Sequence, residues 1–154
     1  DRQALVTPVE ATWQQLLNEW YTEEYQGKGF QEGTVVILSE KGERVRSKSE
    51  KILADYFYRR NILYKYEKPL YLKGYGTVYP DFTFLSKKIG KEIYWEHEGM
   101  VDKQEYARSA VRKIESYQKN DIYPGDRLIL TFETEQSILN SKTIEGLVNR
   151  YLQF

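Results

Sequence analysis

Two acidic residues lie on neighbouring stretches of this chain, at positions where they could hold a metal ion together. Asp81 belongs to an aromatic and β-branched run, residues 77–85, and Glu96 belongs to a second such run, residues 92–99. This composition predicts two β-strands, and the polar break at residues 86–91 predicts a hairpin between them. If the two strands pair antiparallel with their acidic faces aligned, Asp81 and Glu96 become neighbours.

The chemistry of such a pair is that of a hard-metal site. Side chains alternate between the faces of a strand, so Asp81 shares a face with Thr83, and Glu96 shares one with Glu98. Neighbouring carboxylates repel each other unless a cation lies between them. Oxygen ligands of this kind hold Mg²⁺ or Mn²⁺, with water and substrate phosphate in the remaining positions. Either acid alone is better explained as a solvated hairpin residue, but the pair favours a metal site.

Glu50 is a candidate third carboxylate. Ser47 and Glu50 match a capping box, which predicts a helix that begins after Ser47. The residues expected on its buried face are Ile52, Leu53, Tyr56 and Phe57. Two interpretations of Glu50 stay open: it caps the helix, or it points toward the metal from the first helical turn.

Three basic residues, Arg44, Arg46 and Lys48, lie beside this helix start. A charge run is often only a solvated face. Alternatively, these side chains bind the phosphate backbone of a nucleic acid, helped by the dipole and the free N–H groups of the helix N-terminus.

A further helix is expected after the second strand, from a cap at or near Asp102 to about Gln118. Helical periodicity predicts that its buried face carries Ala107, Ala110, Val111, Ile114 and Tyr117. Lys113 lies at the edge of that face, where it either reaches toward the sheet or extends to water. His97 lies on the strand face opposite to Glu96, so we expect it to be a hydrogen-bonded core residue and not a general base.

The remaining elements complete a single domain. A capping box at Thr7 predicts a helix to about Glu24, with Trp13 and Trp20 in the core. Other segments are expected to form a peripheral strand or an extended arm (residues 34–38), a bent strand or one strand and its approach (63–72), a buried strand (127–132) and a final helix (141–152).

The composition limits the possible classes of function. Twenty-three basic and 23 acidic residues give a formal net charge of zero, so any nucleic-acid contact must come from a local patch. The absence of cysteine excludes disulfides and thiolate metal sites, and we expect a cytoplasmic protein. No apolar run approaches the roughly 20 residues that span a bilayer, so no membrane contact is expected. Because the chain does not begin with methionine, we expect a longer parent protein.

The motifs together resemble the PD-(D/E)XK nuclease superfamily. Pro80-Asp81 matches the first half of that signature, and Glu96-His97-Glu98 occupies the second half. The segment 94–100, Tyr-Trp-Glu-His-Glu-Gly-Met, is similar to a bacterial branch of uncharacterised and helicase-associated nuclease domains. The resemblance implies an α/β, restriction-endonuclease-like core with a mixed four-stranded sheet flanked by helices (αβββαβα) over residues 46–154. An extra helix and extended segment, residues 1–45, would pack on this core.

The resemblance also implies residue roles. Asp81, Glu96 and Glu50 would be catalytic acids and metal ligands for Mg²⁺ or Mn²⁺. Glu98 stands where the superfamily usually has lysine, so Lys113 becomes the candidate for that role, while Glu98 either adds a ligand or marks a loss of activity.

The implied function is metal-dependent cleavage of phosphodiester bonds, with DNA as the expected partner. The alternatives are an inactive nucleic-acid-binding module, supported by the zero net charge and by Glu98, and an interaction domain of a larger protein.

Overall fold

The run of residues Glu-Ile-Tyr-Trp-Glu-His-Glu forms the longest strand, β7 (Glu92–Glu98), inside a mixed four-stranded sheet. The structure is a computed structural model, and it describes residues 11–152. The order of strands in this sheet is β3 (Lys65–Tyr66), β6 (Phe82–Leu85), β7 and β8 (Leu128–Phe132). Strand β6 is antiparallel to β7, as the predicted hairpin requires, and β8 is parallel to β7. A parallel pair needs a crossover connection, which α3 (Gln104–Lys119) supplies.

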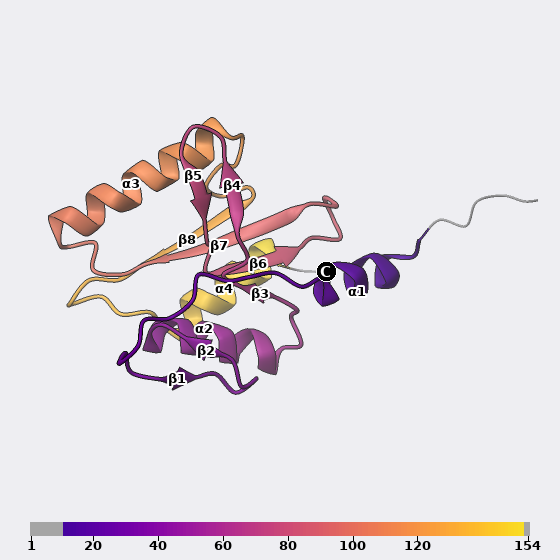
Figure 1. The fold of residues 1–154 in the computed structure, drawn as a ribbon, viewed down its shortest axis with the longest axis horizontal. Helices are drawn as coiled ribbons and strands as arrows, with labels where there is room; N and C mark the ends of the chain where they lie inside the picture. The colour runs from indigo at the N-terminus through magenta and orange to yellow at the C-terminus, as the bar shows by residue number, and fades with distance from the viewer. Residues whose placement is uncertain (1–10, 153–154) are drawn as a thin grey trace, which may run out of the picture.

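Helices cover both faces of this sheet. Figure 1 shows α3 on one side, and α2 (Lys48–Arg59) and α4 (Ser141–Tyr151) on the other. The Phe57 ring of α2 lies 5.0 to 5.2 Å, between ring centroids, from three rings of the sheet, those of Phe82, Phe84 and Trp95. These contacts form the larger hydrophobic cluster of the core. The predicted α/β class with a mixed four-stranded sheet and flanking helices is therefore confirmed.

Two small hairpins lie outside the central sheet: β1 (Ile37–Leu38) with β2 (Arg44–Val45), and β4 (Leu70–Leu72) with β5 (Gly76–Val78). The prediction of one strand over residues 77–85 was therefore wrong. Residues 76–78 pair with β4, residues 79–81 belong to no strand, and β6 begins only at Phe82. Pro80, which has no N–H to donate to a strand partner, lies in this break. Residues 63–72 likewise divide between two sheets, with β3 in one and β4 in the other.

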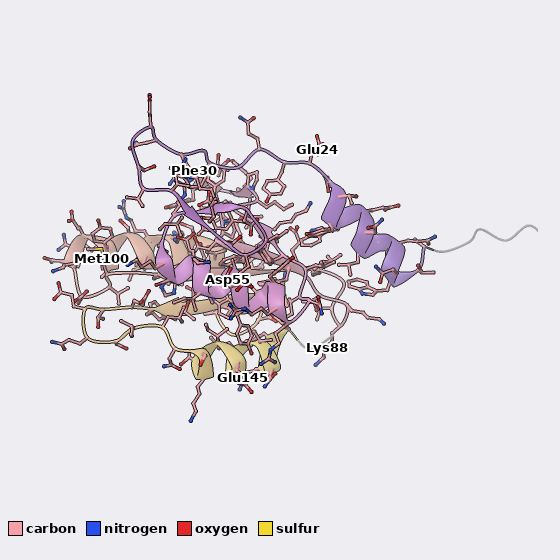
Figure 2. All side chains as sticks on the ribbon, turned by 90° about the horizontal axis from the view of Figure 1, so that it is seen from below. Glu24, Phe30, Asp55, Lys88, Met100 and Glu145 are labelled. Carbon is pink, nitrogen blue, oxygen red and sulfur yellow. The ribbon has the colours of Figure 1, made fainter. Side chains whose placement is uncertain are left out.

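The first helix is shorter and more peripheral than expected. Helix α1 (Trp13–Thr22) begins after Thr12, whose side chain forms a capping box with Gln15. The predicted start at residues 7–10 lies outside the described residues. No residue of α1 is buried, so the prediction that Trp13 and Trp20 are core residues was wrong. Figure 2 shows why: α1 projects at one end of the molecule, where it meets only the edge of the body.

The segment 34–38 behaves mainly as an extended arm. Only Ile37 and Leu38 pair with another strand, and the Val35 side chain is 81% exposed. The segment that precedes it, which carries Phe30, runs along the body in Figure 2.

Three helix details differ from the predictions. Ile52 and Val111 are exposed, at 47% and 52%, because α2 and α3 bury narrower stripes than predicted. In α2 the stripe instead includes Glu50 and Ala54. Helix α3 begins after Lys103, next to the predicted cap position at Asp102, but Lys103 forms no side-chain capping bond. The Asp102 carboxylate instead accepts a hydrogen bond from the Glu135 N–H at 3.3 Å.

Within residues 11–152 we find no helix whose length and hydrophobicity would suit a membrane crossing.

Candidate functional site

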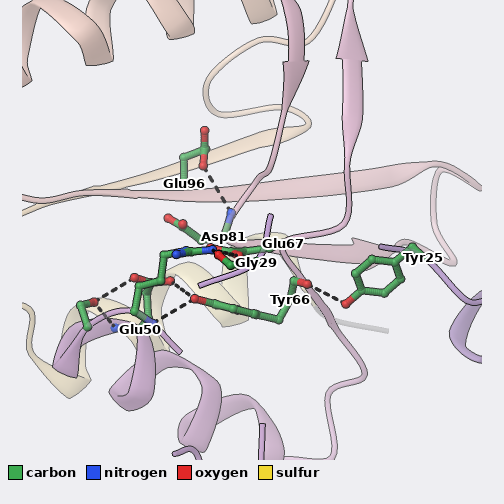
Figure 3. A network of polar contacts seen from close by, with 9 residues as sticks. Tyr25, Gly29, Glu50, Tyr66, Glu67, Asp81 and Glu96 are labelled. Atoms are coloured by element: carbon green, nitrogen blue, oxygen red, sulfur yellow. Dashed lines mark hydrogen bonds and ion pairs between the residues drawn. The ribbon is translucent and has the colours of Figure 1, made fainter. Parts of the chain in front are cut away.

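The pairing of β6 with β7 brings Asp81 and Glu96 together. Phe82 is opposite Trp95 in this register, so Asp81, one residue before the strand, lies opposite Glu96. Two hydrogen bonds join the positions: the Asp81 N–H donates to Glu96 Oε1 at 3.3 Å, and the His97 N–H donates to Asp81 Oδ2 at 2.7 Å. Figure 3 shows both side chains at this point of the sheet. The structure thus places the two acids side by side, as the hairpin predicted.

Lys113 reaches this pair from α3. Its Nζ lies 3.0 Å from Glu96 Oε2 and 2.8 Å from Glu98 Oε1, so it forms ion pairs with both acids. Tyr117, one helical turn further along α3, donates its hydroxyl to Glu96 Oε2 at 3.3 Å. Residues four apart lie on one face of a helix, so α3 presents the ammonium and the phenol to Glu96 together. Of the two open interpretations of Lys113, the structure shows the one in which it reaches the sheet.

Glu50 lies in the first turn of α2, where it is buried. The Glu50 N–H donates to Ser47 Oγ at 3.1 Å, as the capping motif requires. The carboxylate, however, does not return to the Ser47 N–H: it accepts the Ser47 hydroxyl at 3.0 Å and the Tyr66 hydroxyl at 2.6 Å. The predicted capping box is therefore only half present, because the Glu50 carboxylate binds the Tyr66 hydroxyl of β3 and not the Ser47 N–H (Figure 3).

The electrostatics of the three acids favour a cation. Burial and the nearby Glu96 and Glu50 carboxylates raise the pKa of Asp81 well above its usual range. Burial also raises the pKa of Glu96, although Lys113 opposes that shift, and burial raises the pKa of Glu50. Burial disfavours the charged form of Lys113, but Glu96 and Glu98 outweigh that effect and raise its pKa. The lysine is therefore a fixed positive charge beside acids that ionise reluctantly.

The donor atoms suit a hard divalent cation held by two carboxylates. Mg²⁺ in proteins is commonly bound by one or two carboxylates, with water and substrate phosphate completing the shell, and Asp81 and Glu96 supply that donor set. Among the described residues, no group of three or more His, Cys, Asp or Glu side chains is arranged to hold one ion. Glu50 and Glu98 are thus not assembled with the pair into a larger cluster. Glu98 Oε1 is nevertheless a buried oxygen, and the Lys113 ammonium lies 2.8 Å from it.

The predicted phosphate-binding residues are partly engaged in the fold. The Arg46 guanidinium forms an ion pair with Glu67 at 2.5 Å. The guanidinium carbons of Arg44 and Arg46 each lie 4.3 Å from the centroid of the Phe30 ring. Lys48, at the first position of α2, is exposed. The two arginines therefore hold the extended N-terminal segment through Phe30. Among the described residues, Lys48 has no such structural contact and is exposed.

His97 takes part in a separate hydrogen-bond network on the other face of β7. Its Nδ1 lies 2.7 Å from Thr131 Oγ1, and its Nε2 lies against a Glu133 carboxylate oxygen. The side chain is only 4% exposed. This is the hydrogen-bonded core environment expected from the sequence.

Two tyrosines of the site were not recognised as functional from the sequence. Tyr66 binds Glu50 from β3, and Tyr117 binds Glu96 from α3. The four-residue spacing of Lys113 and Tyr117 was a usable signal, because it places both on one helix face. No comparable local signal joins Tyr66 to Glu50, since their contact depends on how β3 packs beside α2.

Comparison with known proteins gives one relative and no assigned activity. No family model matches the chain, and no solved structure matches it. The chain is similar to the "Uncharacterized protein MJ1519" of Methanocaldococcus jannaschii, with 32% identity over 130 residues, which cover 72% of this chain and 10% of the relative. The chain therefore spans about a tenth of the length of that archaeal protein, whose name states no activity.

Proposed function

We propose that this chain is a Mg²⁺- or Mn²⁺-dependent nuclease of the PD-(D/E)XK superfamily that cleaves phosphodiester bonds in DNA. One observation carries the proposal: Asp81 and Glu96 lie side by side, and Lys113 reaches the same point from the next helix. The order of the central elements supports it, since α2, the central-sheet strands β3, β6 and β7, α3, β8 and α4 follow one another as in a restriction-endonuclease-like core, with the β4–β5 hairpin inserted between β3 and β6.

The roles of the residues follow from their contacts. Asp81 and Glu96 would hold the ion, which when bound lowers the pKa of a water molecule and neutralises charge on the phosphate. Lys113 offers a positive charge to the developing negative charge of the phosphoryl oxygens. Glu98 and Tyr117 hold Lys113 and Glu96 in place through the ion pair at 2.8 Å and the hydrogen bond at 3.3 Å. Glu50, in this proposal, adds negative charge near Asp81 from α2.

The position of Lys113 compensates for the departure at Glu98. The superfamily signature expects lysine two residues after the second acid, on the same strand face, and this chain has Glu98 there. Because Lys113 Nζ lies 2.8 Å from Glu98 and 3.0 Å from Glu96, the ammonium still lies at the site, supplied by α3 in place of β7.

A second candidate function is an inactive, nucleic-acid-binding module. The observation in its favour is that Lys113 already forms ion pairs with Glu96 and Glu98. Its ammonium group can therefore neutralise Glu96 without a metal ion. In that case Asp81 and Glu96 would hold no metal ion and take no part in catalysis.

The experiment is cleavage of supercoiled plasmid by the 154-residue chain with Mg²⁺ or Mn²⁺. It compares the wild type with an Asp81→Asn, Glu96→Gln double variant, which keeps the side-chain shapes. Glu115→Gln, an exposed acid of α3, is the matched control. Metal-dependent nicking by wild type and control, lost in the double variant, supports the nuclease. Nicking that survives in the double variant, or that is missing from all three proteins across plasmid and oligonucleotide substrates, contradicts it.

A further inference from the structure

The connection between β3 and β6 is much longer than the sheet requires. These strands are antiparallel neighbours, which a turn of about two to five residues can join. Instead, residues 67–81 separate them and build the β4–β5 hairpin. Figure 1 shows this hairpin standing away from the sheet beside one end of α3, and Figure 3 shows its second strand descending directly to Asp81.

The hairpin is held rigidly against the body. Its inner face buries Leu72 and Val78 in the smaller hydrophobic cluster, together with Tyr117 of α3. At its tip, the Asn120 side chain forms two hydrogen bonds with the backbone of Lys73, one from the Lys73 N–H at 2.9 Å and one to its carbonyl at 3.2 Å. Such anchoring reduces the ordering that a bound ligand would otherwise have to impose.

The outer face of the hairpin presents aromatic rings to solvent. Tyr71, which lies on the face opposite to Leu72, is 70% exposed, and Tyr75 in the turn is 49% exposed. Tyr71 is directly opposite Thr77, which is also exposed, and Tyr79 follows along the chain toward Asp81. The rings thus lead from the tip of the hairpin toward the candidate site.

The charge of this segment suits a polyanion. Between Lys68 and Pro80 the chain carries two lysines and no acidic residue. Lys68 forms an ion pair with Glu92, whereas Lys73 is exposed in the turn between Tyr71 and Tyr75. Aromatic rings interleaved with positive charge are the features by which proteins bind single-stranded nucleic acids, through base stacking and phosphate contact.

From these observations we infer that the outer face of the β4–β5 hairpin binds unpaired nucleotides and leads a single strand to Asp81 and Glu96. Tyr71 and Tyr75 stack on bases, and Lys73 contacts a phosphate. This inference specifies the substrate of the proposed nuclease and in that respect rests on it, but strand binding by the hairpin can be measured without cleavage.

The test is fluorescence anisotropy of a labelled 20-nucleotide oligothymidine, with a blunt duplex of equal length as comparison, in EDTA so that nothing is cut. Tyr71→Ala and Tyr75→Ala should each weaken binding of the single strand about tenfold, the usual scale for loss of a stacking ring. Binding to the duplex should stay unchanged. Tyr71→Phe should bind like wild type, because stacking needs the ring and not the hydroxyl. Lys73→Ala should lower the salt dependence of single-strand binding by about 0.7, the slope of one phosphate contact.

Tyr58→Ala is the matched control, because Tyr58 is 48% exposed but lies on α2. Four results of the binding assay would overturn the inference: no binding of the single strand by wild type, equal losses on single strand and duplex, no loss in the Tyr71 and Tyr75 variants, or an equal loss in Tyr58→Ala. The nuclease proposal fails separately. If plasmid and oligonucleotides stay uncut while Tyr71→Ala still loses single-strand binding, the hairpin binds nucleic acid without catalysis. If wild type and Tyr71→Ala cut single strands equally well, the nuclease stands and the hairpin inference falls.

Discussion

At the scale of single residues, the site is a set of buried acids, two of which form ion pairs with one lysine, Lys113. Sequence reasoning could foresee the Asp81 and Glu96 contact, because strand alternation and a hairpin are local patterns. It could also place Lys113 at the edge of the correct helix face. It could not foresee that Glu98 pairs with Lys113, or that Tyr66 binds Glu50, because both contacts depend on packing between distant segments.

The ammonium of Lys113 gives the first prediction. Lys113→Met should lower the cleavage rate about 10²- to 10³-fold, the usual effect of removing one group that stabilises transition-state charge. Mn²⁺ binding should persist, since Asp81 and Glu96 remain. Adding Glu98→Lys to this variant should restore part of the rate, because position 98 lies within reach of the same acids. Steady-state cleavage and Mn²⁺ titration check both points; unchanged cleavage by Lys113→Met would remove the lysine from the mechanism.

The ionisation of Asp81 gives a prediction about stability. Because the folded protein raises the pKa of Asp81, its neutral form is favoured in the fold. The contribution of Asp81 to the free energy of unfolding is thus most favourable below the pKa of this group in the unfolded chain, about 3.9. This contribution is lost as pH rises through the pKa of Asp81 in the folded protein. Asp81→Asn should therefore stabilise the metal-free protein at neutral pH, and the advantage should vanish toward pH 3.

Thermal unfolding in EDTA between pH 3 and 8 measures this difference. This prediction would be contradicted if Asp81→Asn unfolds at a lower temperature than wild type at pH 7, or if the difference in unfolding temperature is the same at every pH. Either result would show that the ionised Asp81 carboxylate does not destabilise the metal-free fold.

At the scale of elements, sequence patterns located the helices and strands better than their edges and partners. The periodicity of residues 102–118 and 141–152 predicted α3 and α4, because one face of each is apolar. The single strand expected over residues 77–85 failed because its composition suits a strand throughout, whereas pairing with β4 and the break at Pro80 divide it. The exposed positions Ile52 and Val111 show the same limit: helical spacing gives the face but not its width.

The contact between β3 and α2 can be tested through Tyr66. Its hydroxyl donates to Glu50 at 2.6 Å and accepts the Arg46 N–H at 3.1 Å. Tyr66→Phe leaves both partners short of a hydrogen bond, so it should reduce the free energy of unfolding by about 1–3 kcal/mol. Urea denaturation measures the loss. The exposed control Tyr58→Phe should change stability by less than about 0.5 kcal/mol, and an equally small effect at Tyr66 would mean that this phenol does not secure Glu50.

At the scale of the whole molecule, one face of the central sheet forms the hydrophobic core and the other face carries the candidate site. One face of the sheet packs Phe82 and Trp95 against Phe57 of α2 and against α4. The other face carries Glu96 and Glu98 beneath α3, with the β4–β5 hairpin alongside. The mixed sheet was expected from the resemblance of the motifs to a known superfamily, and in the structure α3 supplies the crossover before the parallel strand β8. The sequence did not predict the hairpin or the peripheral α1, because neither is distinguished by local composition from a continuous strand or a core helix.

Metal binding by Asp81 and Glu96 is the claim on which the nuclease depends, and calorimetric titration with Mn²⁺ tests it most directly. The wild type should bind Mn²⁺ more tightly as pH rises from 5.5 to 7.5, because the raised pKa values of both acids mean that protons must leave before the ion binds. The Asp81→Asn, Glu96→Gln variant should lose this binding, while Glu115→Gln should keep it. Equal binding by wild type and double variant, or no binding by the wild type at millimolar Mn²⁺, would contradict the metal centre.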